Sequence, residues 1–280
     1  MKRVAIVTDS TVGLPAELVE ELKLHVVPVL LIQDGQIFRD GVDITPTEVY
    51  RRLRAGEAAF TSAAPPIPEF LKAYQAAAKG ASGVLSIHMS PGLSSTYGAA
   101  LAASESVEGV PMVVFNCNTA AIGQGFVVLE AARAAATGAP LEVVVRRAEE
   151  MSVKIRFLFT LDTFEYLRKS GRMGGAAALM GTLLQIRPVL YLPQGTVEVF
   201  ARPRTKPRAI QVILQQMAQQ PQDRPMHAAV VHADVQQEAE DLRRIVDERF
   251  HPAELLLAEF TPVVGAHTGP GLIGIAFYTE

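Results

Sequence analysis

Short apolar runs alternate with helical patterns through the first half of the chain. The run from Val4 to Thr8 reads as a buried strand, and Asp9, Ser10 and Thr11 supply capping residues before Pro15. The same order of strand, turn and helix repeats twice, with strands at Val84 to Ile87 and Met112 to Phe115. The apolar helical positions of the three units are Leu14, Leu18 and Leu22, then Leu93, Tyr97 and Leu101, then Phe126 to Leu129. Such alternation predicts a parallel sheet covered by helices.

One segment of the first half, Pro28 to Asp43, departs from this order. Apolar and polar residues alternate on both sides of Asp34 and Gly35, a pair typical of a tight hairpin turn. We therefore expect a small β hairpin excursion from the first domain.

The pattern changes after the Ala-rich helix ends near Gly138 and Pro140. A charged helix through Arg146 to Glu150 leads into a strand at Ile155 to Phe159, and we place a domain boundary near Ser152. A hairpin follows, formed by Val189 to Leu192 and Val197 to Phe200. After it we expect helix Pro207 to Gln219, strand Ala228 to Val231, helix Glu238 to Phe250, strand Leu255 to Phe260 and strand Leu272 to Tyr278. The predicted fold class is α/β, with an N-terminal parallel-sheet domain over residues 1–152 and a C-terminal mixed α/β domain over residues 153–280.

Composition narrows the class of protein. The 280 residues are 49% hydrophobic and 20% charged, which is ample for buried cores. A net charge of −3 argues against nucleic acid and anionic membrane, because both favour concentrated Lys and Arg. No apolar stretch approaches the roughly 20 residues of a spanning helix, so we expect no stable membrane insertion. With Cys117 as the single cysteine and too short an apolar run for a signal peptide at the start, we expect a cytoplasmic protein.

Several signatures of cofactor chemistry are missing from the sequence. It has no phosphate-binding loop ending in Gly-Lys-Ser or Gly-Lys-Thr, no Rossmann glycine triad after Val7, and no cluster of His and Cys with metal-ligand spacing. We therefore expect no cofactor and no metal.

Two hydroxyl-rich segments are candidates for holding an anion. Ser94, Ser95 and Thr96 follow a Pro-Gly turn and are expected to begin a helix, where hydroxyls and free backbone N–H groups favour an anion. Thr61 and Ser62 precede a proline-rich loop that leads into the next helix. The alternatives are an ordinary helix cap in the first segment and a simple connecting loop in the second.

His267 is the strongest single candidate for a site. It lies in the segment Gly-Ala-His-Thr-Gly-Pro-Gly together with Thr268, where three glycines let the backbone approach something closely. A structural histidine is the alternative. Arg172 lies on a glycine-rich stretch and is a candidate for contacting a phosphate or an acidic partner, with a solvated helix-end arginine as its alternative.

An enzyme is the rival hypothesis. Ser94 and His267 supply the residue types of a serine-dependent acyl hydrolase, although the segment around Ser94 lacks the second glycine of a nucleophile elbow.

Five motifs, taken in order, resemble the DegV family of bacterial fatty-acid-binding proteins. They are VTDST, TSAAP, SPGLSSTY, LRKSGRM and GAHTGPG, and the resemblance spans nearly the entire chain. It implies two α/β domains that enclose a fatty acid, and a role as the binding subunit of a fatty acid kinase. It also implies that the carboxylate is held by residues from the motifs at Thr61, Ser62, Ser94, Ser95, His267 and Thr268, and that Arg172 contacts the ATP-dependent kinase.

The chain departs from the family pattern at three places. Ala63 and Ala64 replace the usual Gln and Pro, and Ser95 replaces a Gly, so two departures adjoin the expected carboxylate pocket. Asn116 and Cys117 replace an Asp-Ser pair after the third strand of the alternating pattern.

The leading hypothesis is a lipid-binding protein with no catalytic residues of its own. It binds a palmitate-like long-chain fatty acid in a buried tunnel and presents the carboxylate to a kinase that forms the acyl phosphate. Besides the hydrolase, a regulatory module that senses lipid without presenting it is the other alternative.

Overall fold

A parallel four-stranded sheet organises the N-terminal side of the molecule. The computed structural model describes residues 3–179, 186–221 and 223–280. The strand order is β2 (His25–Val27), β1 (Val4–Asp9), β6 (Gly83–His88) and β7 (Met112–Asn116), and every neighbouring pair is parallel. β1 and β6 lie at the centre and are almost wholly buried, as their continuous apolar runs predict. The predicted parallel sheet is confirmed.

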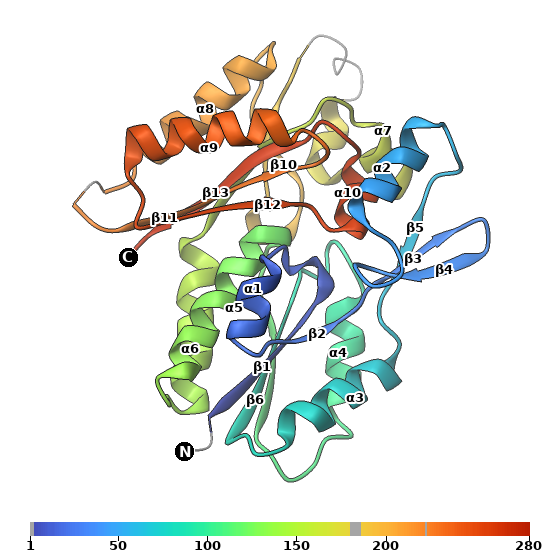
Figure 1. Ribbon diagram of the computed structural model, residues 1–280, viewed down its shortest axis with the longest axis vertical. Coiled ribbons are helices and arrows are strands. Elements are labelled where there is room, and N and C mark those ends of the chain that lie inside the picture. Colours follow the sequence, from blue (N-terminus) through green and yellow to red (C-terminus); the bar gives the residue numbers. More distant parts are fainter. Residues whose placement is uncertain (1–2, 180–185, 222) are drawn as a thin grey trace.

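Helices cover both faces of this sheet (Figure 1). One face carries α3 (Ile67–Ala78) and α4 (Thr96–Ser104), and Val7 and Val84 pack there against Phe70 and Tyr74. The other face carries α5 (Ala121–Ala136) and α6 (Leu141–Lys154), with α1 (Ala16–Glu21) beside α5. Neighbouring residues of each strand thus belong to different cores, because side chains alternate across a sheet.

The predicted helical face at Leu93, Tyr97 and Leu101 is wrong. The helix begins at Thr96, so Leu93 precedes it, and Leu101 is 44% exposed. Thr96, Ala100 and Ala103 form the buried face instead, because α4 packs against its neighbours through small side chains.

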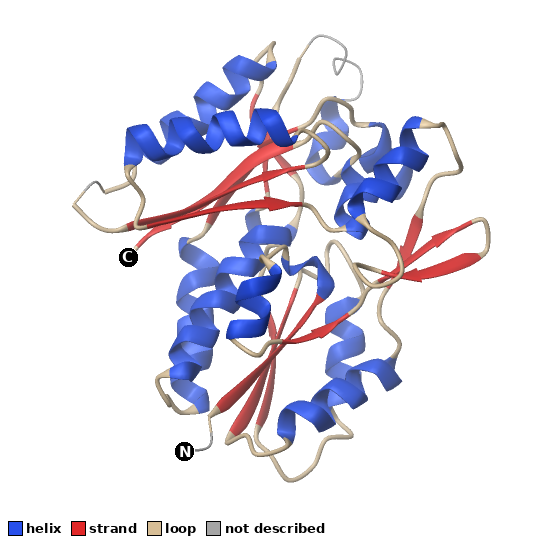
Figure 2. Ribbon diagram, viewed as in Figure 1, coloured by secondary structure: helices blue, strands red, loops and turns tan. Residues whose placement is uncertain are grey.

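A three-stranded antiparallel sheet forms the predicted excursion (Figure 2). The hairpin of β3 (Leu30–Gln33) and β4 (Gln36–Arg39) is confirmed, and Asp34 and Gly35 both adopt positive φ, as a two-residue type I′ turn requires. The sequence predicts no strand at Thr61 and Ser62, only the loop that follows them. They lie in a third strand, β5 (Thr61–Ala63), which pairs with β3 after the intervening helix α2 (Pro46–Arg54).

A mixed six-stranded sheet organises the C-terminal side. Its order is β10 (Glu198–Ala201), β9 (Val189–Tyr191), β8 (Arg156–Thr160), β13 (Ile273–Thr279), β11 (Met226–His232) and β12 (Glu254–Glu259). Only β11 and β12 pair in parallel, so the mixed sheet and the antiparallel hairpin β9–β10 are confirmed. α8 (Lys206–Ala218) and α9 (Gln236–Phe250) cover one face (Figure 1).

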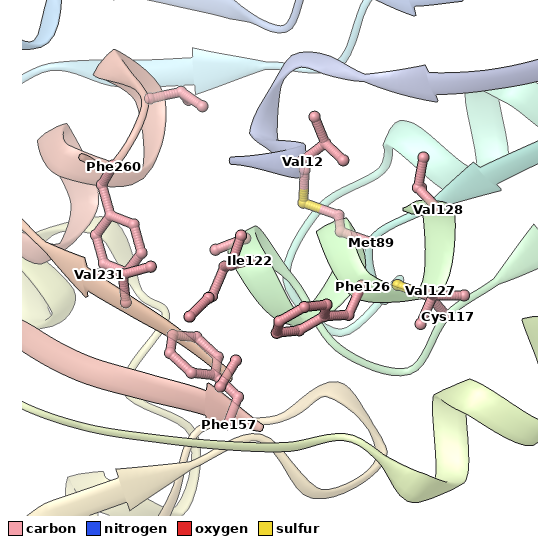
Figure 3. Packing of buried hydrophobic residues seen from close by; sticks show 14 of the residues in the cluster. Val12, Met89, Cys117, Ile122, Phe126, Val127, Val128, Phe157, Val231 and Phe260 are labelled. Atoms are coloured by element: carbon pink, nitrogen blue, oxygen red, sulfur yellow. The ribbon is translucent and has the colours of Figure 1, made fainter. Parts of the chain in front are cut away.

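The other face of the six-stranded sheet packs toward α5. Figure 3 shows Ile122 and Phe126 of α5 pointing toward Phe157 of β8 within one continuous apolar cluster. The rings of Phe126 and Tyr278 meet edge to face at 5.3 Å. α5 and α6 therefore lie between the two large sheets. The proposed division near Ser152 falls in the last turn of α6.

A short helix that the sequence does not predict, α10 (Pro262–Thr268), follows β12. The three glycines around His267 suggest a loop, but His267 lies in the last turn of this helix. α10 lies beside α2 although the two are about two hundred residues apart in the chain (Figure 1). The segment 30–63 thus reaches across to the C-terminal half of the molecule.

Candidate functional site

An apolar cavity of about 110 Å³ lies where the two halves of the chain meet. Thr11 and Met89 line it just after β1 and β6, at the carboxyl ends of parallel strands, where α/β sheets commonly bind ligands. The rest of the wall is largely aliphatic and aromatic, contributed by Val29, Leu93, Ala120, Ala121, Phe157, Phe159, Leu167, Leu192, Val197, Phe260, Val263, Val264 and Leu272.

Five of the predicted polar residues line this cavity, and they come from four separate segments. Ser62 comes from β5, Ser94 from the turn before α4, Arg172 from the segment after α7 (Glu165–Ser170), and His267 and Thr268 from the last turn of α10. The structure thus brings these five predicted residues together around one space. Thr61 and Ser95 are exposed and do not line it.

Ser62 and His267 form the central polar contact. Ser62 Oγ and His267 Nε2 are 2.7 Å apart, although 205 residues separate them in sequence. Burial, together with the positive charge of Arg172, lowers the pKa of His267 to about 4. The imidazole is therefore neutral at neutral pH, with one nitrogen able to donate and the other to accept. Its Nδ1 is buried and has no hydrogen-bond partner among the described residues.

The hydroxyls of Ser94 and Thr268 differ in the hydrogen bonds that they already make within the protein. Ser94 Oγ lies 2.8 Å from Thr96 Oγ1 and accepts from Thr96 N–H at 3.2 Å, so it caps α4 while facing the cavity. Thr268 Oγ1 donates to the Val264 carbonyl at 2.9 Å, within its own helix. Either hydroxyl of the Ser94–Thr96 contact can be the donor, so Ser94 can donate to a ligand when Thr96 donates to Ser94 Oγ.

Arg172 is a half-buried cation without a carboxylate partner in the described part of the chain. Its Nε donates to the Leu93 carbonyl at 3.3 Å and its Nη1 to the Ser170 carbonyl at 2.6 Å. Burial lowers its pKa, which means that its charge is incompletely compensated. An anion in the cavity would supply that compensation.

The glycines around His267 make close approaches, but to side chains of this protein. A Cβ on Gly265 would lie 2.5 Å from the Tyr50 hydroxyl, while Gly269 and Gly271 pack in the same way against Tyr166 and Asp162. Gly269 and Gly271 also adopt positive φ. The glycines therefore seat α10 between α2 and α7.

The departures from the family pattern lie at different depths. Ala63 and Ala64 are half-buried and do not line the cavity. Cys117 is fully buried, and burial raises the pKa of its thiol to about 12, so it is an unreactive packing residue. Asn116 hydrogen-bonds to Asn118 in the turn after β7. None of these four residues touches the cavity.

The sequence analysis missed the apolar wall and one polar member of it. Thr11 lines the cavity and hydrogen-bonds to the fully buried Asp9, whose other oxygen lies 2.8 Å from His88 Nδ1. Thr11 closes the motif VTDST, so that motif was the available signal. The wall residues come from eleven segments, which no local pattern groups together.

The geometry does not favour the hydrolase hypothesis. His267 contacts Ser62 rather than Ser94, and no carboxylate of the described residues orients its Nδ1 as a catalytic triad requires. A histidine with a pKa of about 4 is also a weak general base at neutral pH.

Within the described ranges, no group of three or more His, Cys, Asp and Glu side chains is arranged to hold a metal ion. No helix among them is long and apolar enough to cross a bilayer.

Known proteins resemble this chain along its whole length. A DegV domain-containing protein of Streptomyces coelicolor is 35% identical over 277 residues, covering 98% of each chain. A structure described as fatty acid binding of a DegV family protein from Thermus thermophilus has a TM-score of 0.94 and 34% identity, covering 99% of this chain and all of that one. DegV of Bacillus subtilis, described as a fatty acid binding protein, has a TM-score of 0.93 and 29% identity over the full length of both chains.

The family model described as "Uncharacterised protein, DegV family" matches residues 3–280. With that match, the shared architecture and the identity to curated relatives, the chain belongs to the DegV family.

Proposed function

We propose that this protein binds one long-chain fatty acid, with its tail in the apolar cavity and its carboxylate at the Ser62–His267 contact, and presents that carboxylate to a separate ATP-dependent kinase. The observation that carries the proposal is the combination at one cavity of an apolar wall, a buried His267 nitrogen without a hydrogen-bond partner among the described residues, and an arginine without a carboxylate partner among them. Two relatives with the same fold are described as fatty-acid-binding proteins.

The polar end suits an ionised carboxylate. A carboxylic acid with a pKa near that of Glu, about 4.3, is charged at neutral pH and needs donors when buried. Ser62, Ser94 and neutral His267 supply uncharged donors, and Arg172 supplies opposite charge. Because these groups come from separate segments, the carboxylate would be held from several sides, which fixes the direction of the tail.

The apolar wall would supply most of the affinity. Burying some fifteen tail carbons at roughly 0.8 kcal/mol each yields about 12 kcal/mol before the costs of association and ordering. The polar cluster then sets orientation and selects for a free acid over an ester, which has no charge to pair with Arg172.

Mass spectrometry of lipid extracted from the denatured, purified protein tests the binding. We expect close to one fatty acid per chain, against background amounts in an unrelated protein purified in parallel. Absence of lipid, together with failure to take up added hexadecanoic acid, would refute the proposal.

The kinase role is tested separately, by incubating the loaded protein with ATP and a fatty acid kinase. Formation of acyl phosphate supports presentation. Binding without phosphorylation would leave a lipid-sensing module as the better description.

A further inference from the structure

Asp40 does not line the cavity, and the proposed function gives it no part in binding the ligand. It is 2% exposed and follows β4 in the excursion. Its Oδ1 accepts a hydrogen bond of 2.8 Å from the backbone N–H of Val263, 223 residues away in the chain. A carboxylate from the N-terminal half therefore contacts the first turn of α10.

α10 lacks a cap of its own. The first N–H groups of a helix have no intrahelical partner and usually bond to the side chain of the N-cap residue. The N-cap residue, Thr261, makes no such bond, and Pro262 at the first helical position has no N–H to offer. Asp40 thus caps the helix from a distant segment, and its negative charge suits the N-terminal end of the helix.

The same segment holds the other parts of α10. Tyr50 of α2 packs against Gly265 in the middle of the helix, and Ser62 of β5 contacts His267 in its last turn. Three contacts from residues 30–63 therefore follow α10 from its first turn to its last. Because the helix has only seven residues, moving its first turn would move His267 as well.

We propose that Asp40 is a positioning residue, which caps α10 and thereby holds the His267 imidazole at the Ser62 hydroxyl in the geometry that receives the ligand. This inference rests on the proposed function for the identity of the ligand, but the position of His267 can be measured without any ligand.

Asp40 has polar neighbours, and no cationic side chain among the described residues pairs with it. The hydroxyls of Ser10 and Thr261 lie beside it, Asp9 and Tyr50 are the nearest titratable groups, and its Oδ2 has no hydrogen-bond partner among the described residues. Burial raises the pKa of Asp40 to about 6, and the hydrogen bonds of Ser10 and Val263 only partly offset this. Capping needs an acceptor oxygen rather than a full charge, so an amide oxygen can replace the carboxylate.

Three variants test the proposal. Asp40→Ala removes the acceptor, Asp40→Asn keeps an acceptor oxygen without the charge, and Asp43→Asn is the control. Asp43 lies on the same excursion but is solvent-accessible and pairs with Arg39 rather than with α10. The readouts are the Kd for hexadecanoic acid and the pKa of His267 from NMR titration of the ligand-free protein.

We expect Asp40→Ala to raise the Kd about ten-fold and to move the His267 pKa up toward its usual value as the ring leaves its buried position. Asp40→Asn and Asp43→Asn should stay within about three-fold of the wild-type Kd, with the histidine unchanged. If Asp40→Ala does not fold, Asp40→Leu, which keeps the shape of the side chain without an acceptor, takes its place.

An unchanged His267 pKa and an unchanged Kd in the variant without the acceptor would overturn the positioning role. Failure of the wild-type protein to bind hexadecanoic acid would refute the proposed function instead. The His267 titration would still decide the role of Asp40 in that case.

Discussion

At the scale of single residues, the polar end of the cavity is set by which hydroxyls remain free to meet a ligand. Ser62 and Ser94 face the cavity with their hydroxyl groups, whereas the Thr268 hydroxyl donates its hydrogen bond to a carbonyl within α10. Their sequence neighbours Thr61 and Ser95 have the same chemistry but face solvent. The chain therefore contains its own control for each candidate.

Replacing Ser94 with Ala should weaken fatty acid binding. Loss of a hydrogen bond to a charged, buried partner costs on the order of 1–3 kcal/mol, so we expect the Kd to rise roughly ten-fold or more. Titration with a fluorescent fatty acid measures this. Ser95→Ala is the matched control, since Ser95 is exposed and outside the lining. Equal affinity in Ser94→Ala and the wild type would remove Ser94 from the headgroup site.

The pKa of His267 predicts a pH dependence of stability. The unfolded histidine takes up a proton near pH 6.5, but the folded one does so only near pH 4. Its contribution to folding is therefore present above pH 6.5 and lost as pH falls to about 4, by roughly 3 kcal/mol. Asp40 acts in the opposite sense, because its folded pKa of about 6 lies above its usual 3.8.

Denaturant unfolding of the wild type and of His267→Gln between pH 4 and pH 7 isolates this effect. We expect the difference in unfolding free energy between the two proteins to shrink as pH falls, since the contribution of Asp40 is common to both. A difference that does not vary with pH would contradict the buried, neutral histidine.

At the scale of elements, the sequence predicts the helices, strands and turns whose own residues show a short-range pattern. The run at β1 and the Asp34–Gly35 turn were identified because their patterns are short-range. β5 was missed because its three small or polar residues form a strand only by pairing with β3. α10 is not predicted because Gly265 lies within it and Gly269 and Gly271 follow it, and glycine is unfavourable for a helix in isolation. The Asp40 cap and the Tyr50 contact come from distant residues.

The packing of α10 on α2 gives a test at the same scale. Gly265→Ala places a Cβ against the Tyr50 hydroxyl, and we expect a loss of about 1–3 kcal/mol in the free energy of unfolding. Gly98→Ala is the control, because Gly98 lies in helix α4 with no atom within 4 Å of the added Cβ. It should stabilise the protein by about 0.5–1 kcal/mol. Equal stability of Gly265→Ala and the wild type would show that the helix can shift.

At the scale of the whole molecule, ion pairs join the two halves beside the apolar core. Arg133 of α5 pairs with Glu254 of β12 at 2.6 Å, and Glu254 also lies 3.1 Å from His227 of β11. Burial would raise the pKa of Glu254, but the hydrogen bonds of His227 and Arg133 outweigh it and hold that pKa at about 2. Sequence could not predict this pairing, because it depends on how the sheets are stacked.

A double-mutant cycle on Arg133 and Glu254, both changed to Ala, should give a coupling free energy of about 1 kcal/mol. The pair is partly exposed, with 38% and 18% of the side chains accessible, so a larger value is not expected. The exposed pair Lys72 and Glu69 in α3 is the control and should give less than about 0.5 kcal/mol. Equal coupling in both pairs would mean that Arg133 and Glu254 do not help to hold the two halves together.

Arg172 is the residue that we predict to contact the proposed kinase. We predict that Arg172→Ala still binds fatty acid but is phosphorylated slowly by the kinase, because the resemblance assigns this residue to the partner contact. Arg202→Ala, at an exposed arginine after β10, is the control. Equal turnover of loaded Arg172→Ala and loaded wild type would remove the partner role, and complete loss of lipid binding would mean that the charge of Arg172 contributes more to the affinity than the apolar wall does.

The position of β13 has a consequence for how the protein is made. This strand, residues 273–279, lies between β8 and β11 in the middle of the six-stranded sheet. While the ribosome is still adding residues before it, β8 and β11 have no strand to join them, and both present unpaired edges. The four-stranded sheet is complete by residue 116 and can form much earlier. A nascent chain should therefore fold its first half during translation and close its cavity only after β13 has left the exit tunnel.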